Sequence, residues 1–216
     1  MQYQICSRYM ERLYSFYSPF YDFFFGKLLE PGRRKAFRYL SRRPGQKILE
    51  IGIGTGSSLE LYPPYSRVVG IDIAPGMIEQ AQKRAQGLNN ATEIKLMVMD
   101  AAQLEFPDNH FDAVVASYVI TTVPDPHQVC REIIRVTRPG GQIIAVNHTR
   151  SENGWYLGRV EDILAPLCVP IGFTTDLDVL KVMRETGIHI QSTVKCNLLN
   201  LHRIIMGTKN NHRHPN

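Results

Sequence analysis

The chain has 216 residues, of which 44% are hydrophobic, so it can bury one substantial core. Its four cysteines (Cys6, Cys130, Cys168 and Cys196) contain no CxxC pair, which excludes a zinc or disulfide framework and favours a reducing compartment. No run of about 18 uncharged apolar residues predicts a membrane-spanning helix. Charged residues interrupt the N-terminus, so no secretory signal peptide is expected.

The net charge of +5 is concentrated in residues 27–47. That stretch holds eight basic residues against one acidic residue, a local charge of +7. Ten of the chain's 20 aromatic residues lie just before it, within the first 25 positions. A basic block contacts nucleic acid, an anionic membrane surface or only water. Rings beside lysine and arginine are typical of an interfacial helix, so we expect residues 1–47 to contact an anionic membrane, with plain core packing as the alternative.

From residue 46 onward, strand-like and helix-like segments alternate. We predict strands at 47–54, 67–74, 93–101, 111–119, 142–148, 189–199 and 201–209, and helices at 77–87, 127–141, 154–168 and 176–187. The second of these helices is expected to include a closing Pro-Gly-Gly. Strands separated by helices form a parallel sheet with helices on both faces. The fold is therefore predicted to be α/β, a Rossmann-like seven-stranded sheet, mostly parallel with an antiparallel edge strand.

No repeat or linker divides the chain, so we expect a single domain over residues 1–216 and a monomer. Its parts are an amphipathic, aromatic helical membrane or lid segment at 1–45, a cofactor-binding core at 46–148, a helical substrate-side insert at 149–188 and a final strand pair at 189–209.

A glycine-rich loop follows the first predicted strand. Glu50, Gly52, Gly54 and Gly56 have the spacing ExGxGxG. A dinucleotide fingerprint would read G-x-G-x-x-G, and Ser57 stands where its third glycine would be. An acid at the end of the strand fits a cationic ligand group, such as an ammonium, better than a pyrophosphate. The loop therefore predicts close approach of the backbone to a ligand.

Further candidates follow the next strands, because ligands gather at the carboxyl ends of parallel strands. Asp72 ends the second strand, where a carboxylate can accept the hydroxyls of a ribose, and Asp100 follows the third strand. Four more residues are expected in this pocket: Met77, Ile73, Ala101 and Ser117. Tyr118 also ends the fourth strand and is expected to face the cofactor pocket or the core, whereas Asp112 begins that strand and is predicted to be structural.

This ordered set, continued by residues 95–141, resembles the class I S-adenosylmethionine-dependent methyltransferases over about two-thirds of the chain. The resemblance implies S-adenosyl-L-methionine as the cofactor and S-adenosyl-L-homocysteine as its product. It also implies that Asp100 lies near the adenine amino group, with Met77 placed to cover the adenine face. No metal is expected, and no nucleic-acid partner either, because no recognition module is visible.

Residues 17–37, 50–63 and 145–151 are also similar to the bacterial phospholipid N-methyltransferases. That resemblance implies N-methylation of phosphatidylethanolamine, and of its mono- and dimethyl forms, towards phosphatidylcholine. The enzyme would be cytoplasmic and peripheral at the inner face of the cytoplasmic membrane. Open alternatives are a quinone-precursor C-methyltransferase, another small-molecule methyltransferase, and a cofactor-sensing or lipid-binding module without turnover.

Residues outside the cofactor loop are assigned to the lipid substrate. His148 ends the fifth strand and is expected to accept the amine proton or hydrogen-bond the headgroup. Tyr14, Tyr17 and Tyr21 have helical spacing and are expected to surround a methylated ammonium by cation–π contact, with Tyr21 also touching the cofactor. The flanking Asn147 is expected to bind the substrate. Arg150 or Arg159 is expected to pair with the lipid phosphate.

Overall fold

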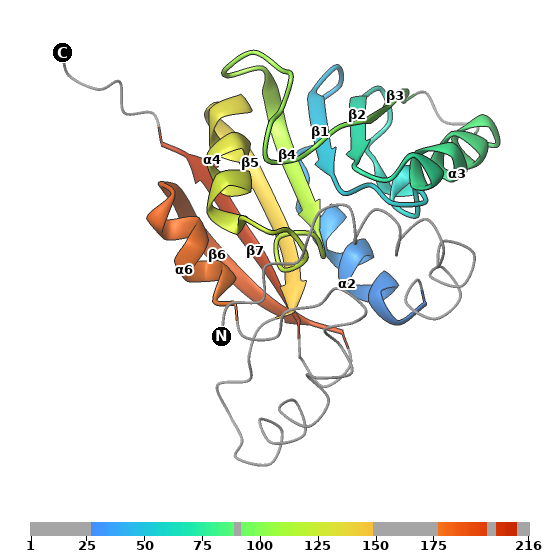
Figure 1. Cartoon of the computed structure of the whole chain (residues 1–216). Helices are drawn as coiled ribbons and strands as arrows, with labels where there is room; N and C mark the ends of the chain where they lie inside the picture. The colour runs from blue at the N-terminus through green and yellow to red at the C-terminus, as the bar shows by residue number, and fades with distance from the viewer. Residues whose placement is uncertain (1–26, 89–91, 149–176, 198–201, 211–216) are drawn as a thin grey trace.

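The computed structural model describes residues 27–88, 92–148, 177–197 and 202–210 (Figure 1). Within these ranges a seven-stranded sheet has the strand order β3-β2-β1-β4-β5-β7-β6. The strands are β1 (Lys47–Ile51), β2 (Arg67–Asp72), β3 (Glu93–Val98), β4 (Phe111–Ser117), β5 (Thr137–His148), β6 (Ile188–Cys196) and β7 (His202–Lys209). Strands β1 to β5 are parallel, and β7 runs antiparallel to both β5 and β6. The predicted Rossmann-like sheet, mostly parallel with an antiparallel pair at one edge, is confirmed.

Helices cover both faces of this sheet (Figure 1). Helices α4 (Pro126–Val136) and α6 (Val179–Glu185) pack on one face, and α2 (Lys27–Phe37) and α3 (Pro75–Gln86) on the other. Because successive strand residues point to opposite faces, Leu49 and Ile51 enter the core under α4 and α6. Ile48 enters the core under α2, and Glu50 points to that same face. The alternation therefore buries a carboxyl group beneath α2.

The predicted helix at 127–141 is wrong at its C-terminal end. Helix α4 ends at Val136, and Thr137 has extended φ/ψ of −75° and 134° and starts β5, where it pairs with Phe111. Arg138 precedes a proline, which disfavours the helical region for that residue. The Pro-Gly-Gly sequence therefore forms an irregular stretch in the sheet, where the register shifts between Phe111 and Ala113, instead of closing the helix.

Helix α2 lies antiparallel to β1, so its first residues lie near the carboxyl ends of the strands and its last residues near their amino ends. Near its start, the Tyr118 hydroxyl donates to the Leu29 carbonyl at 2.8 Å, beyond the carboxyl end of β4. Just after its end, the Ser41 amide donates to the Gln142 side chain, on the amino-terminal side of β5. The basic residues of 27–47 are consequently divided between the carboxyl ends and the amino ends of the strands. No helix within the described ranges is long and apolar enough to cross a bilayer.

Candidate functional site

A cavity of about 330 Å³ opens where the parallel strands end. Its wall is formed by the residues that follow β1, β2, β3 and β4, together with one residue of α2. The predicted cofactor residues that line it are Gly52, Gly54, Asp72, Ile73, Met77, Asp100, Ala101, Ser117 and Tyr118. A small-molecule site of this size usually has mostly apolar walls and a few polar groups. The sheet thus brings together nine residues that are spread over the sequence.

The three loop glycines all have positive φ, but they do different things. A Cβ on Gly54 would meet nothing within 4 Å, so this glycine faces the open cavity. A Cβ on Gly52 would lie 2.6 Å from Val119. A Cβ on Gly56 would lie 2.7 Å from Leu59 and 3.2 Å from Ala81 of α3. Gly54 therefore leaves room for a ligand, whereas Gly52 and Gly56 allow close packing behind the loop.

Asp72 joins the glycine loop to the start of α3. Its Oδ2 accepts the amide of Gly54 at 2.9 Å, and its Oδ1 accepts the amide of Ala74 at 3.0 Å. Burial raises the pKa of this carboxyl, and the backbone amides oppose that rise. The backbone amide of Ile73 also acts on this carboxylate, which has about four acceptor sites, so one site remains for a ligand hydroxyl from the cavity it lines. Asp72 both shapes the loop and offers an acceptor.

Asp100 and Ala101 lie in the turn after β3. The Asp100 Oδ1 accepts the Ala102 amide at 2.8 Å, which fixes the turn and leaves the side chain exposed at the cavity rim. Gln128 of α4 donates to the Ala102 carbonyl at 3.1 Å. The wall that carries Asp100 is therefore tied to α4.

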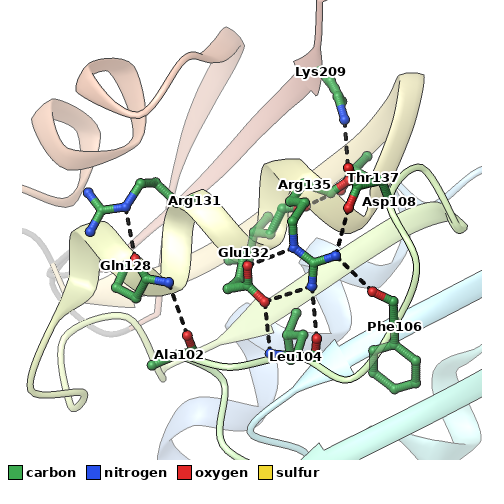
Figure 2. Close-up of polar contacts among 11 residues, drawn as sticks. Ala102, Leu104, Phe106, Asp108, Gln128, Arg131, Glu132, Arg135, Thr137 and Lys209 are labelled. Carbon is green, nitrogen blue, oxygen red and sulfur yellow. Dashed lines mark hydrogen bonds and ion pairs between the residues drawn. The ribbon is translucent and has the colours of Figure 1, made fainter.

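Arg135 holds the loop that follows this part of the wall (Figure 2). Its guanidinium donates to the carbonyls of Leu104 and Phe106, each at 2.8 Å, and pairs with Asp108 at 2.8 Å and with Glu132 at 2.7 Å. Glu132 in turn accepts the Leu104 amide at 2.8 Å. The pKa of Glu132 is lowered, chiefly by its hydrogen bond from the arginine. This network holds the loop between β3 and β4 against α4.

Glu50 does not line the cavity. Its carboxyl is 2% exposed beneath the glycine loop, where Ser58 donates to it at 2.5 Å and the Tyr62 hydroxyl also donates. Burial raises the pKa of Glu50 to about 7, against the lowering effects of both hydrogen bonds and of Arg33. The contact of Glu50 with a ligand ammonium stays a prediction, and its observed partners are groups that shape the loop from behind.

Ser117 ends β4, Tyr118 follows it directly, and both line the cavity. The Ser117 Oγ is buried without a hydrogen-bond partner among the described residues. Tyr118 has a φ of +62°, and its amide donates to the Val146 carbonyl at 2.6 Å. Its hydroxyl bonds to α2, and its ring meets His202 edge-on at 5.5 Å between centroids. Tyr118 therefore anchors helix α2 at the site.

The predicted substrate residues fall mostly outside the described ranges. Tyr14, Tyr17, Tyr21, Arg150 and Arg159 all lie there, and their roles stay predictions.

The end of β5 is described. His148 pairs in register with His202 of β7 at the carboxyl edge of the sheet. Asn147 is fully buried, and neither atom of its amide has a hydrogen-bond partner among the described residues. Asp112, expected to be structural, accepts the Lys47 amide at 2.6 Å and pairs with Arg138 at the other edge of the sheet.

Sequence reasoning missed Arg33, which lines the cavity from α2. The signal was available, because Leu29, Ala36, Phe37 and Leu40 follow helical spacing and are all buried. Arg33 falls on that same apolar side, where a charged residue needs a reason. Composition alone distinguishes it from no other residue of the basic block.

The chemistry of the cavity fits an amino-acid nucleoside. Gly54 gives the backbone room for a ligand, Asp72 offers an acceptor for a hydroxyl, and Met77 supplies an apolar surface for a base. A cationic residue, Arg33, lies among the other lining groups. These are the groups that S-adenosylmethionine requires, so the residues present fit that cofactor. Among the described residues, no group of three potential metal ligands occurs.

Comparison with known proteins supports S-adenosylmethionine as the cofactor. A family model described as a methyltransferase domain matches residues 49–145. The chain is 36% identical over 170 residues to a phosphatidylethanolamine N-methyltransferase of Cereibacter sphaeroides, covering 79% of this chain and 83% of that protein. It is 34% identical over 112 residues to a demethylmenaquinone methyltransferase of Renibacterium salmoninarum, covering 51% of this chain and 45% of that protein.

The fold also matches a solved S-adenosylmethionine-dependent methyltransferase of Aquifex aeolicus, with a TM-score of 0.63 and 16% identity, covering 84% of this chain and 91% of the other. The extent of the first match exceeds the methyltransferase core alone. The chain is therefore an enzyme that uses S-adenosylmethionine as its cofactor, and it belongs to the class I methyltransferases, in the family of the bacterial phosphatidylethanolamine N-methyltransferases.

Proposed function

We propose that this enzyme N-methylates phosphatidylethanolamine, and then its mono- and dimethyl forms, towards phosphatidylcholine. The observation that carries the proposal is the 36% identity to the Cereibacter sphaeroides enzyme over 79% of this chain. That match reaches well beyond residues 49–145, which are common to methyltransferases of many substrates.

When bound, the cofactor supplies an electrophilic methyl group on a sulfonium. The protein must hold the attacking nitrogen in line and free of its extra proton. Gly54 and Asp72 hold the cofactor at the end of β1 and β2, which directs the reacting end towards β4 and β5. His148 ends β5 on that side. In this proposal His148 accepts the ammonium proton of the headgroup, whereas Asn147, which is fully buried and outside the described cavity lining, is given no direct contact with it.

The lipid substrate requires contact with a bilayer, and we propose the cytoplasmic face of the inner membrane, with a monomer acting there. Arg34 is exposed on α2, next to the cavity-lining Arg33, and makes only a surface pair with Glu30 at 2.5 Å. Arg42 and Arg43 are also exposed, but they follow α2 near the opposite edge of the sheet. If a membrane covers the cavity mouth, attraction to anionic lipid falls off within a Debye length, so the basic residues next to the cavity, such as Arg34, contribute most.

The proposal is tested with methyl-labelled S-adenosylmethionine and liposomes of phosphatidylethanolamine, with and without an anionic lipid, followed by separation of the lipids. Label is expected in the mono-, di- and trimethylated lipids, and more of it when anionic lipid is present. An enzyme that binds the cofactor but labels none of these lipids would contradict the phospholipid assignment.

A second candidate is C-methylation of a quinone precursor. The specific observation in its favour is the 34% identity to the demethylmenaquinone methyltransferase, although the chain spans less than half the length of that protein. Adding demethylmenaquinone to the same liposomes lets both substrates compete for one cofactor pool. Preferential label in the quinone would favour this candidate.

A further inference from the structure

One basic residue lines the cavity among the described residues. Arg33 reaches it from α2, and its guanidinium carbon lies 5.7 Å from the centroid of the Tyr118 ring. The three acidic residues of the described lining are Asp72, which ends β2, Asp100, which follows β3, and Asp125, which caps α4. The cation therefore lies beside Tyr118 at the end of β4, and two of the three carboxylates lie on the β2 and β3 part of the wall.

The guanidinium has unused hydrogen-bonding capacity. Its Nη1 is buried and has no hydrogen-bond partner among the described residues, whereas the adjacent Arg34 is paired with Glu30. Arginine presents five donors in a fork that matches a carboxylate. A buried, charged donor without a partner is costly, so such a group usually has a ligand or a protein partner.

The nearest acid does not meet this need. Glu50 attracts Arg33 electrostatically, but its Oε2 already accepts hydrogen bonds from Ser58 and Tyr62. Burial also raises the pKa of this carboxyl to about 7, so it is only partly ionised at neutral pH. Among the described residues, no carboxylate is therefore hydrogen-bonded to the Arg33 Nη1, and the fork is left for an anion in the cavity.

The position of Arg33 is built into the packing of α2. The Tyr118 hydroxyl donates to the Leu29 carbonyl, one turn before Arg33. At Gly32 the helix approaches so closely that a Cβ would lie 2.5 Å from both the Tyr118 hydroxyl and the Asn197 amide oxygen. These contacts fix the position of α2 along its axis and its rotation about that axis. They therefore hold the Arg33 side chain against the cavity.

We propose that Arg33 binds the α-carboxylate of S-adenosylmethionine. With a ribose hydroxyl on Asp72, the amino-acid end of the cofactor extends from β2 past Gly54 towards β4, where Arg33 lies. The α2 helix, part of the basic segment, thereby contributes directly to the cofactor site. The inference rests on the cofactor alone and holds whichever substrate is methylated.

The test is calorimetric binding of two probes, S-adenosylhomocysteine and its decarboxylated analogue, which differ only in the carboxylate. Arg33→Met is expected to weaken binding of S-adenosylhomocysteine by about 10- to 100-fold and to change binding of the decarboxylated analogue by less than twofold. Arg33→Lys should recover part of the loss. Arg34→Met, the matched control on the exposed side of the same helix, should bind both probes like the wild type.

Two outcomes would overturn the proposal. Equal losses for both probes in Arg33→Met, with Arg33→Lys no better, would show that the residue only supports the fold. Unchanged binding of S-adenosylhomocysteine together with a raised KM for phosphatidylethanolamine liposomes would assign Arg33 to the lipid phosphate. Thermal denaturation of each variant identifies any variant that is unfolded. If Arg33→Met is unfolded, the same comparison of the two probes is made with Arg33→Lys.

Discussion

The buried Glu50 makes a quantitative prediction about stability and pH. Its pKa is about 7 in the folded protein against an ordinary value of 4.5, a difference of about 2.5 units, caused mainly by burial. The folded state keeps the proton between these values, whereas the unfolded state releases it. The free energy of unfolding therefore falls as the pH rises from about 4.5 to 7, and the contribution of this carboxyl is about 3 kcal/mol at about 1.36 kcal/mol per unit.

Glu50→Gln removes that proton while keeping an acceptor for Ser58 and Tyr62. We expect the variant to gain about 3 kcal/mol relative to the wild type between pH 4.5 and 8, because all other titrating groups are shared. Urea denaturation followed by circular dichroism at several pH values measures the difference. Tyr62→Phe is the matched control, since it loses one hydrogen bond to Glu50 but keeps the carboxyl and hence a pH-dependent profile. Parallel profiles for wild type and Glu50→Gln would refute the reasoning.

Three further comparisons between variants test other features of the structure. Gly56→Ala should lower the unfolding free energy by about 2–4 kcal/mol, because Gly56 has a positive φ and a close contact. Gly54→Ala should lower it by only about 1 kcal/mol and should instead weaken S-adenosylhomocysteine binding at least about 10-fold. Urea denaturation measures the stability and calorimetry the binding. Arg34→Gln should weaken sedimentation with anionic liposomes by about fivefold, and Arg42→Gln should not. Arg135→Met should lower the unfolding free energy by about 2 kcal/mol, because two loop carbonyls lose their donor.

Each of these predictions has a result that opposes it. Equal destabilisation by both glycine variants would mean that Gly54 is packed rather than open. Equal effects of Arg34→Gln and Arg42→Gln on liposome binding would place the bilayer elsewhere. Arg131→Met is the control for Arg135, since Arg131 is more exposed and should change stability by less than about 0.5 kcal/mol. A loss as large as that of Arg135→Met would contradict the role of the loop network in Figure 2.

The sequence alone predicted the sheet well, because its information is local. Alternating buried strands and helical spacing are written in consecutive residues, and parallel connection then brings the ends of β1 to β4 together. Gly54, Asp72 and Asp100 could be placed at one cavity for this reason. The family resemblance added the cofactor, which the residues alone left undecided between nucleotide types.

Distant contacts override the local sequence signal in two places, and the first explains the wrong end of the helix predicted at 127–141. Thr137 follows a helical pattern, yet it leaves the helix to pair with Phe111 across the sheet. A Pro-Gly pair usually marks a turn, but Pro31 and Gly32 lie inside α2, where the glycine permits the close approach to Tyr118. Neither partner is visible from the neighbouring sequence.

Glu50 shows the same limit for function. Its position at the end of a strand predicts a ligand contact, which stays a prediction, but the sequence did not reveal that strand alternation directs its carboxyl beneath α2, where Ser58 and Tyr62 donate hydrogen bonds to it. Arg33 shows the converse, because its role depends on an unpaired donor that only the three-dimensional structure reveals. Composition placed it in a charged segment, and packing turned one face of that segment towards the cavity.

The central claim is that this methyltransferase converts phosphatidylethanolamine to its methylated forms. The most direct measurement is mass spectrometry of the lipids of a bacterial host that makes phosphatidylethanolamine but no phosphatidylcholine, after expression of the wild type and, as a control, of Asp72→Ala. The account predicts mono-, di- and trimethylated lipid with the wild type and strongly reduced amounts with Asp72→Ala. A lipid profile unchanged by a folded wild-type enzyme that binds S-adenosylhomocysteine would contradict it.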